Sequence, residues 1–128
     1  MEEKILEIME RFIVCKLIYI FGSYGTEYFN QDSDIDIAFL AKEKVDAKTK
    51  FDLKLYLIQE LGYEIDLIDL DDAKPVLAKE IVCKGRVIYA MDEIAKDEFM
   101  YKTMALYGQY VDDIKVIVDK VKERGHIL

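Results

Sequence analysis

The stretch GSYGTEYFNQDSDID, residues 22–36, lies between two short apolar runs, KLIYIF at residues 16–21 and IDIAFL at residues 35–40, the second of which begins inside it. Both runs are rich in β-branched and aromatic residues, so each predicts a β-strand. Alternate residues of a strand point to the same face, which places Asp34 and Asp36 on one face, about 7 Å apart. Two carboxylates at this distance repel each other and favour a cation between them. We therefore expect a divalent cation at the start of the second strand.

Gly22 and Ser23, where the first strand ends, supply a second element of the same site. Glycine lets the backbone approach a ligand closely. If a helix begins just after it, the free N–H groups of that helix and the Ser23 hydroxyl can hold phosphate oxygens. Magnesium is a hard cation that binds carboxylates and fills its other positions with water and substrate phosphates. Pairing of the two strands would bring these residues together, so the pattern predicts a site for a nucleotide with a metal.

A third acid, Asp66, lies in a later apolar run, YEIDLIDL at residues 63–70. Apolar residues flank it, and the centre of a strand is an unusual place for a carboxylate that has no function. Beside Asp34 and Asp36, it would complete a triad able to coordinate metal and to accept the proton of an attacking hydroxyl.

Each of these elements also has a purely structural interpretation when it is taken alone. A Gly-Ser pair is common in loops, and Asp-x-Asp at a strand start is also typical of turns. The combination of Gly-Ser, ten residues and Asp-x-Asp is what favours a functional site. Farther along, Asp69, Asp71 and Asp72 follow the Asp66 strand, and we expect them to solvate a loop or to cap the next helix.

Helical and strand periodicities alternate along the whole chain. The segment at residues 23–33 is mixed, and we interpret it as a short helix followed by a polar turn. The pattern predicts a single domain over residues 1–128, with an α/β (α+β) fold in which helices cover one sheet. The other expected helices are residues 5–13, 46–62, 71–85 and about 92–123, and the expected strands are 17–21, 34–40, 63–70 and 86–90.

Two helical patterns predict which side chains are buried. Residues 46–62 place Phe51, Leu55, Ile58 and Leu61 on one face, and Gly62 is the expected C-cap. The long final helix has two interpretations: its apolar side chains pack on the sheet, or they form an interface with a second copy or a partner, since Tyr and Met are enriched at such surfaces. The Met and Tyr residues concerned are Met100, Tyr101, Met104, Tyr107 and Tyr110.

The composition is that of an ordinary globular protein, with 52% hydrophobic and 34% charged residues. The net charge of −8 argues against direct binding to nucleic acid or to anionic membranes, which need a basic surface. A bridging divalent metal would still allow ATP to bind. The start MEEKILEI lacks a signal-peptide layout and no apolar run approaches membrane-spanning length, so we expect a cytoplasmic protein. Cys15 and Cys83, each at the end of an apolar helical pattern, are expected to be buried thiols in a reducing compartment.

Four further residues have weaker patterns. Lys79, Lys84 and Arg86 could contact phosphates, although the sequence gives no geometry for them. His126, the single histidine, lies close to the end of the sequence, and we expect it in a solvated tail.

The Gly22-Ser23 pair, the ten intervening residues, Asp34-Ile35-Asp36 and Asp66 on a later strand resemble the nucleotidyltransferase superfamily related to DNA polymerase β. The short chain resembles its minimal (MNT) branch. The resemblance implies a nucleotidyltransferase-type fold with a mixed β-sheet of about four strands flanked by helices, and transfer of a nucleoside monophosphate with ATP and Mg²⁺. By the same resemblance Gly22 and Ser23 grip the triphosphate, Asp34 and Asp36 hold Mg²⁺, and Asp66 completes the metal site and acts as a base.

The resemblance also implies a partner. Many proteins of the minimal branch are antitoxins of type VII-like pairs, and they silence a HEPN-domain ribonuclease toxin by adenylylating a tyrosine near its active site. The chain has no counterpart of the extra domain with which larger relatives bind antibiotics or RNA, so the acceptor is expected to come from the partner. Two alternatives stay open here: a binding module that silences the toxin by occlusion, and an antibiotic-type, small-molecule nucleotidyltransferase. Both a homodimer and a hetero-oligomer with the toxin agree with the pattern.

Overall fold

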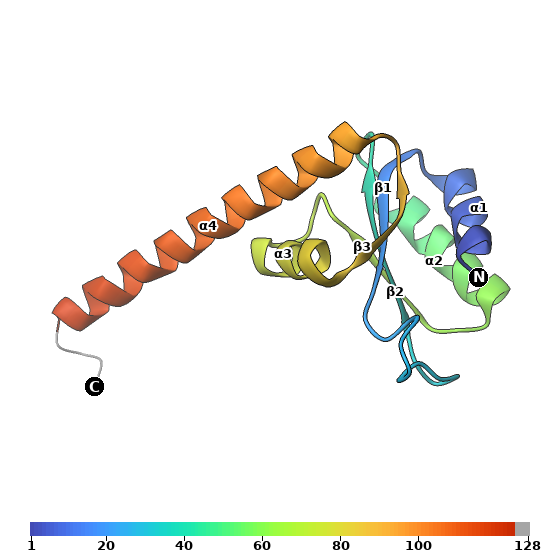
Figure 1. The fold of residues 1–128 in the computed structure, drawn as a ribbon, viewed down its shortest axis with the longest axis horizontal. Helices are drawn as coiled ribbons and strands as arrows, with labels where there is room; N and C mark the ends of the chain where they lie inside the picture. The colour runs from blue at the N-terminus through green and yellow to red at the C-terminus, as the bar shows by residue number, and fades with distance from the viewer. Residues whose placement is uncertain (125–128) are drawn as a thin grey trace.

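The computed structural model describes residues 1–124, and within them the chain forms four helices and four strands (Figure 1). His126 lies outside the described residues. The predicted elements are confirmed except for the short helix in residues 23–33. In chain order the elements are α1 (Glu2–Phe12), β1 (Cys15–Phe21), β2 (Ile35–Ala41), α2 (Ala47–Leu61), β3 (Ile65–Asp69), α3 (Pro75–Lys84), β4 (Arg86–Ala90) and α4 (Glu93–Glu123).

The four strands form one mixed sheet in the order β3-β2-β1-β4. Strand β1 pairs antiparallel with β2 and with β4, whereas β2 and β3 are parallel. The register places Asp36 beside Phe21 on one side and beside Asp66 on the other. The expected mixed four-stranded sheet is therefore confirmed, and its register decides which polar residues become neighbours.

Helices cover both faces of the sheet, with α1 and α2 on one face and α3 on the other (Figure 1). Alternation along β2 divides its side chains between two cores, because successive residues of a strand point to opposite faces. Ile35 and Ile37 are fully buried with α1 and α2, whereas Ala38 is buried with Ile81 of α3. Asp36 therefore lies on the α3 face of the sheet.

The loop between β1 and β2 contains turns and no helix, so the expected helix in residues 23–33 is wrong. Gly22 and Gly25 have φ angles of 78° and 82°, which lie outside the right-handed helical region. Polar side chains of the loop also bond to their own backbone: the Asn30 carboxamide accepts from the Asp32 N–H, and the Thr26 hydroxyl donates to the Ser23 carbonyl. Such local bonds compete with helix formation.

The predicted buried face of α2 is half right, because Ile58 and Leu61 are partly buried against the core whereas the other two residues are not. Phe51 and Leu55 are 61% and 50% exposed, whereas Leu53 and Leu57 are completely buried. The helix has apolar residues on two faces, and the sheet covers only one of them, so periodicity alone did not select the correct face. The ends of α2 follow the expected chemistry, because the Asp46 side chain accepts from the Thr49 N–H and Gly62 caps the C-terminus with a φ of 76°.

The expectation for the cysteines is half right. Cys15 is buried, although it begins β1 and does not end a helical pattern, and burial together with the charge of Asp69 raises the pKa of its thiol to about 12. Cys83 is exposed on α3, so the expected burial of this thiol is wrong. In residues 1–124, no helix combines the length and the apolar character needed to cross a membrane.

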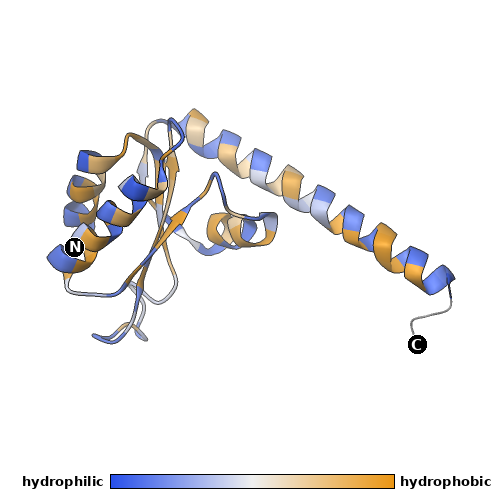
Figure 2. Cartoon of the chain, turned by 180° about the vertical axis from the view of Figure 1, so that it is seen from behind, coloured by the Kyte–Doolittle hydropathy of each residue, from blue (hydrophilic) through white to orange (hydrophobic). Residues whose placement is uncertain are grey.

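Helix α4 is 31 residues long and leaves the body of the molecule after its first turns (Figure 1). Its buried residues are Ala95, Phe99 and Thr103. Figure 2 shows hydrophobic residues recurring along the helix far beyond these positions. Packing on the sheet therefore explains only the beginning of α4, and the interpretation that its Met and Tyr residues pack there is wrong for most of the helix.

Candidate functional site

Asp36 and Asp66 are direct neighbours on the parallel strands β2 and β3. Adjacent strands lie about 4.8 Å apart, and paired residues point to the same face. Both carboxylates therefore lie on the α3 face, opposite the side chains that pack against α1 and α2. Asp36 is half-buried, whereas Asp66 and Asp34, which precedes β2, are exposed. The sheet thus brings together the two strand acids that the sequence singled out, with Asp34 two residues away.

The end of β1 brings Gly22 and Ser23 next to these three acids, and the five residues together form one corner of the sheet. Gly22 has a positive φ, and a Cβ at this position would overlap the Asp36 Oδ2 atom. Only glycine therefore leaves room for the Asp36 carboxylate. The carbonyl of Ser23 accepts from the Thr26 N–H at 3.0 Å and from its hydroxyl at 2.6 Å. Within residues 1–124 the Ser23 hydroxyl itself makes no hydrogen bond, which leaves it available to a ligand.

The electrostatics of the corner are unfavourable in the free protein. Burial is the main cause that raises the pKa of Asp36 from 3.8 to about 6, and the negative charges of Asp66 and then Asp34 add to the shift. A shift in this direction means that the environment opposes ionisation of Asp36. A bound cation would reverse this effect, because it favours the charged form of every nearby carboxylate.

The donor set suits a hard metal that shares its ligands with a substrate. The three acids offer oxygen atoms only, which is the chemistry that Mg²⁺ prefers. Among the described residues, no three His, Cys, Asp or Glu side chains gather closely enough to hold a metal unaided. The corner is therefore an open carboxylate site. Mg²⁺ commonly occupies such sites with water and phosphate oxygens as its remaining ligands.

An aromatic cluster that sequence reasoning missed holds the β1–β2 loop in place. The Phe29 ring lies 5.2 Å from the Tyr24 ring, edge to face, and 5.2 Å from the Tyr63 ring. Tyr63 comes two residues before β3, so the cluster ties the loop that contains Gly22 to the strand that contains Asp66. The signal for this cluster in the sequence was the presence of Tyr24 and Phe29 in a largely polar loop.

The structure places the expected cations in structural contacts. Arg86 pairs with Glu2, and its Nη2 atom lies beside Gly25 in the loop. Lys84 pairs with Glu80 at 3.0 Å, and the Lys79 ammonium lies 5.2 Å from the centre of the Tyr107 ring.

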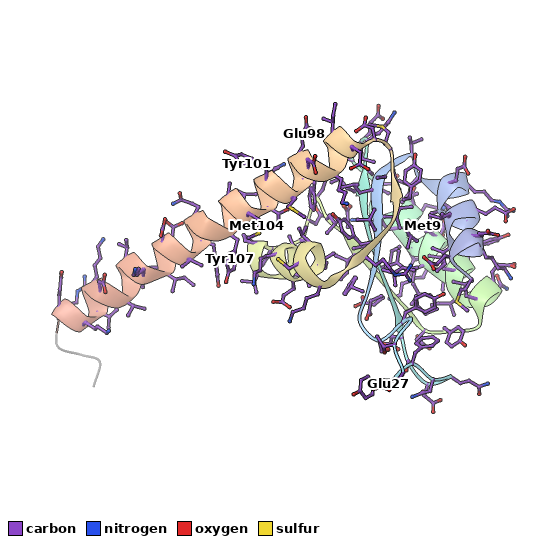
Figure 3. All side chains as sticks on the ribbon, viewed as in Figure 1. Met9, Glu27, Glu98, Tyr101, Met104 and Tyr107 are labelled. Carbon is purple, nitrogen blue, oxygen red and sulfur yellow. The ribbon has the colours of Figure 1, made fainter. Side chains whose placement is uncertain are left out.

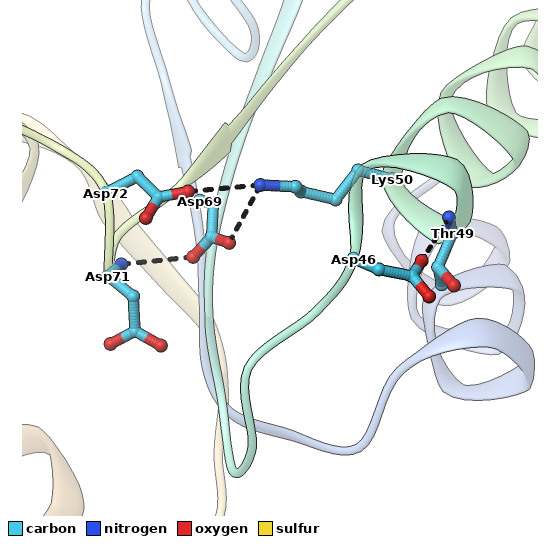
Figure 4. Close-up of polar contacts among 6 residues, drawn as sticks. All are labelled: Asp46, Thr49, Lys50, Asp69, Asp71 and Asp72. Carbon is cyan, nitrogen blue, oxygen red and sulfur yellow. Dashed lines mark hydrogen bonds and ion pairs between the residues drawn. The ribbon is translucent and has the colours of Figure 1, made fainter.

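The acids after Asp66 do not cap α3, so that alternative is wrong, whereas Asp71 and Asp72 lie exposed in the loop after β3, as the other alternative expected. Lys50 of α2 lies 3.3 Å from Asp69 and 3.1 Å from Asp72 (Figure 4), and the Asp69 carboxylate also accepts from the Asp71 N–H. The N-cap of α3 is Lys74, which makes no capping bond through its side chain. These acids stabilise the connection between α2 and β3 and are separate from the Asp36–Asp66 pair.

The mixed sheet and this corner are typical of nucleotidyltransferases. Residues 3–94 match the family described as polymerase beta, nucleotidyltransferase, and the chain belongs to this family. Protein adenylyltransferase MntA from Shewanella oneidensis is 34% identical over 122 residues, which are 94% of this chain and 86% of MntA. The resemblance inferred from the sequence is thus confirmed, and the chain is a nucleotidyltransferase.

Solved structures agree over nearly the whole chain. A toxin–antitoxin structure with AMP-PNP matches with a TM-score of 0.84 and 32% identity, covering 94% of this chain and 98% of the matched one. The complex of tri-AMPylated Shewanella oneidensis HEPN toxin with MNT antitoxin contains a chain that matches with a TM-score of 0.80 and 32% identity, covering 94% and 95%. The nucleotidyltransferase-type fold is therefore confirmed.

Proposed function

We propose that this chain is the antitoxin of a type VII-like toxin–antitoxin pair. It is a protein adenylyltransferase that uses ATP and Mg²⁺ to transfer AMP to a tyrosine of a HEPN ribonuclease toxin. The observation that carries this proposal is the Asp36–Asp66 pair beside Gly22, in a chain that is 34% identical to an adenylyltransferase along 94% of its length.

Each residue of the corner has a role in this proposal. Gly22 and the Ser23 hydroxyl hold phosphate oxygens of ATP, because glycine lets the backbone approach a ligand closely and the Ser23 hydroxyl makes no hydrogen bond within residues 1–124. Asp34, Asp36 and Asp66 would hold Mg²⁺. The metal, when bound, supplies positive charge against the triphosphate and the leaving group. Asp36 is held in position by the strands on both sides, whereas Asp66 is open to solvent and so to an acceptor.

The reaction is a displacement at the α-phosphorus of ATP. The tyrosine oxygen forms a bond to this phosphorus, the bond to the oxygen that bridges to the β-phosphate breaks, and pyrophosphate leaves. A tyrosine hydroxyl has a pKa near 10 and is a weak nucleophile until its proton is removed. Asp66 accepts that proton, and the chain otherwise contributes positioning and electrostatic stabilisation, which dominate phosphoryl-type transfer.

The proposal also covers the domain and its location. We take residues 1–128 as a single minimal nucleotidyltransferase domain, so that the toxin itself presents the acceptor. We place the protein in the cytoplasm, where ATP is available and where a reducing environment keeps Cys15 and Cys83 as the free thiols observed.

The mass of the toxin tests this function. Purified HEPN toxin is incubated with the chain, ATP and Mg²⁺, and its intact mass is measured together with its ribonuclease activity. The expected result is a gain of one or more AMP units that parallels the loss of ribonuclease activity. Loss of ribonuclease activity without any gain in mass would show that the chain acts by occlusion and would refute the proposed transfer.

A further inference from the structure

Arg86 lies at the same end of the sheet as the proposed nucleotide site. It is the first residue of β4, and the register places it beside Ile20, two residues before Gly22. Asp36 and Asp66 are the second residues of β2 and β3, whose starts lie beside the end of β1. The strand order β3-β2-β1-β4 therefore arranges four residues in one row across the sheet: Asp66, Asp36, Gly22 and Arg86.

The guanidinium of Arg86 reaches the turn that begins at Ser23. The Thr26 N–H closes this turn by donating to the Ser23 carbonyl at 3.0 Å, and Gly25 is the third residue of the turn. A Cβ on Gly25 would have the Arg86 Nη2 atom as a neighbour at 3.7 Å. Ser23, whose hydroxyl we assign to phosphate oxygens, and the Arg86 guanidinium therefore belong to or lie against the same turn.

The β1–β2 loop itself supplies no positive charge for a triphosphate. Residues 22–36 contain no Lys or Arg, and the first charged residue after Ser23 is Glu27. Glu27 lies in the outer part of the loop, beyond the end of the sheet (Figure 3). ATP carries more negative charge than one Mg²⁺ neutralises, and a guanidinium can donate two parallel N–H bonds to phosphate oxygens. The cation that the loop lacks is therefore present on the neighbouring strand, at Arg86.

In the free protein, Glu2 of α1 pairs with the guanidinium through the Arg86 Nη1 atom. The side chains of Arg86 and Glu2 are 53% and 38% exposed, so water screens their attraction, and ion pairs of this kind contribute little to stability. A phosphate group held by the loop has more negative charge than one carboxylate. Replacement of Glu2 by a phosphate therefore sacrifices only a weak interaction and forms a stronger one.

The direction of the reaction across the sheet indicates which phosphates Arg86 meets. Displacement at phosphorus places the attacking and leaving oxygens in line. The acceptor approaches from Asp66 on β3, so pyrophosphate leaves toward the opposite side, past Gly22 and toward β4. We propose that Arg86 exchanges Glu2 for the β- and γ-phosphates of ATP and binds the leaving group. This inference rests on the proposed adenylyl transfer.

Substitutions at the two ends of this ion pair should have opposite effects. Calorimetry on the isolated chain with Mg²⁺ measures the dissociation constant for α,β-methylene-ATP, an analogue that cannot transfer AMP. We expect Arg86→Ala to raise this constant at least about 10-fold. Arg86→Lys should restore part of the affinity, because lysine keeps the charge without the two parallel N–H groups. Glu2→Gln removes the competing carboxylate and should lower the dissociation constant about twofold.

Two controls separate a phosphate contact from a structural one. Lys84→Ala removes a cation two residues away, which pairs with Glu80 at 3.0 Å, and should change the dissociation constant less than about twofold. AMP, which lacks the β- and γ-phosphates, should bind equally well to the wild type and to Arg86→Ala. If Glu2→Gln weakens binding of the analogue as Arg86→Ala does, the ion pair only anchors the loop and the proposal is refuted. Glu2→Gln retains Arg86, so it tests the proposal even if Arg86→Ala does not fold.

The outcomes separate this inference from the proposed function, because binding of the analogue is measured without the toxin. If the wild type adds AMP to the toxin and Arg86→Ala binds the analogue as tightly as the wild type, the role of Arg86 is refuted and the transfer stands. If the wild type adds no AMP and the two ends of the ion pair have the expected opposite effects, the transfer is refuted and the phosphate contact stands. A wild type that does not bind the analogue would refute both.

Discussion

The carboxylate of Asp36 occupies the space that a side chain at position 22 would need, so only glycine fits at this position. The antiparallel register of β1 and β2 produces this contact, because it pairs Phe21 with Asp36 and places the next residue at the end of the strand. The phosphate-binding and metal-binding halves of the proposed site therefore touch directly. A substitution at either residue should therefore alter the geometry at the other.

Gly22→Ala should disable the site, and its effect should be larger than backbone strain alone would cause. An L-residue with a positive φ costs on the order of 1–2 kcal/mol. At Gly22 a Cβ would also displace the Asp36 carboxylate, so we expect AMP transfer to fall at least about 100-fold. Gly62→Ala is the matched control, because it has nearly the same φ and nothing within 4 Å. Urea unfolding and transfer rates check both variants, and equal losses of activity would contradict the expectation.

The raised pKa of Asp36 predicts a pH dependence of stability in the protein without ligands. The folded state binds a proton on Asp36 up to about pH 6, whereas the unfolded chain releases it near 3.8. The folded state thus binds more protons between these values, so the contribution of Asp36 to stability falls as the pH rises through this window. Well above pH 6, Asp36 is ionised in both the folded and the unfolded state, so its unfavourable contribution to stability no longer changes with pH.

Comparison with Asp36→Asn isolates this effect from other titrating groups. In EDTA, the free energy of unfolding of Asp36→Asn minus that of the wild type should increase from about pH 4 to about pH 6 and then level off. Urea unfolding at several pH values measures this difference. A difference that is constant with pH, or that decreases, would show that burial and the neighbouring acids do not oppose the ionisation of Asp36.

The sequence predicted the corner better than its surroundings. Period-two alternation placed Asp34 and Asp36 at the start of a strand and Asp66 inside another, and these strands exist. The direct pairing of Asp36 with Asp66 depends on the parallel register of β2 and β3, which no local pattern contains. The path of the loop after Gly22 was also not predicted, because it includes packing of Phe29 against Tyr63, which is distant in the sequence.

The helices show more clearly that local sequence patterns do not determine which residues are buried. Leu53 and Phe51 are equally apolar, and only the position of the sheet decides that the first is buried and the second exposed. The apolar residues that recur along the exposed part of α4, such as Val111 and Ile114, predict that something covers them. Periodicity alone does not indicate whether the sheet of the same chain or another molecule covers these residues.

Mg²⁺ together with ATP should stabilise the folded chain by binding to the carboxylates of Asp34 and Asp36. A ligand that binds only the folded state adds a free energy that grows with its concentration relative to the dissociation constant, about 2.7 kcal/mol at a 100-fold excess. We expect a clear rise in melting temperature for the wild type and none for Asp34→Asn with Asp36→Asn. The control is Asp112→Asn with Asp119→Asn, which removes two exposed charges from α4. The same rise in all three proteins would locate the metal elsewhere.

Phe29→Ala should loosen the loop that holds Gly22 and Ser23. The Phe29 ring contacts both Tyr24 and Tyr63, and its loss removes the attachment of the loop to the start of β3. We expect KM for ATP to rise about 10-fold, whereas Tyr28→Ala, at a neighbouring side chain that is 76% exposed, should leave it unchanged. Steady-state kinetics give the comparison. Phe29→Tyr should retain the wild-type KM, since an aromatic ring is kept, and equal effects of the Phe29→Ala and Tyr28→Ala variants would refute the anchoring role.

Asp66→Asn separates binding from catalysis. The substitution keeps the shape of the side chain and removes the carboxylate that is expected to accept the tyrosine proton. Asp66 is exposed on β3, next to Asp36, so the change should leave the fold intact. The variant should still bind the toxin and should still bind ATP, yet it should transfer AMP at least about 100-fold more slowly, within the usual effect of a lost general base.

Three measurements on the same preparation decide this prediction: toxin binding by calorimetry, nucleotide binding by the ATP-dependent melting shift, and transfer by the rate at which the toxin gains mass. Asp69→Asn is a matched control on the same strand, because Asp69 pairs with Lys50 on the α2 side and has no part in the proposed chemistry. It should transfer AMP at close to the wild-type rate. If Asp66→Asn transfers as fast as Asp69→Asn, the proton of the tyrosine leaves by another route and Asp66 has no role as the base.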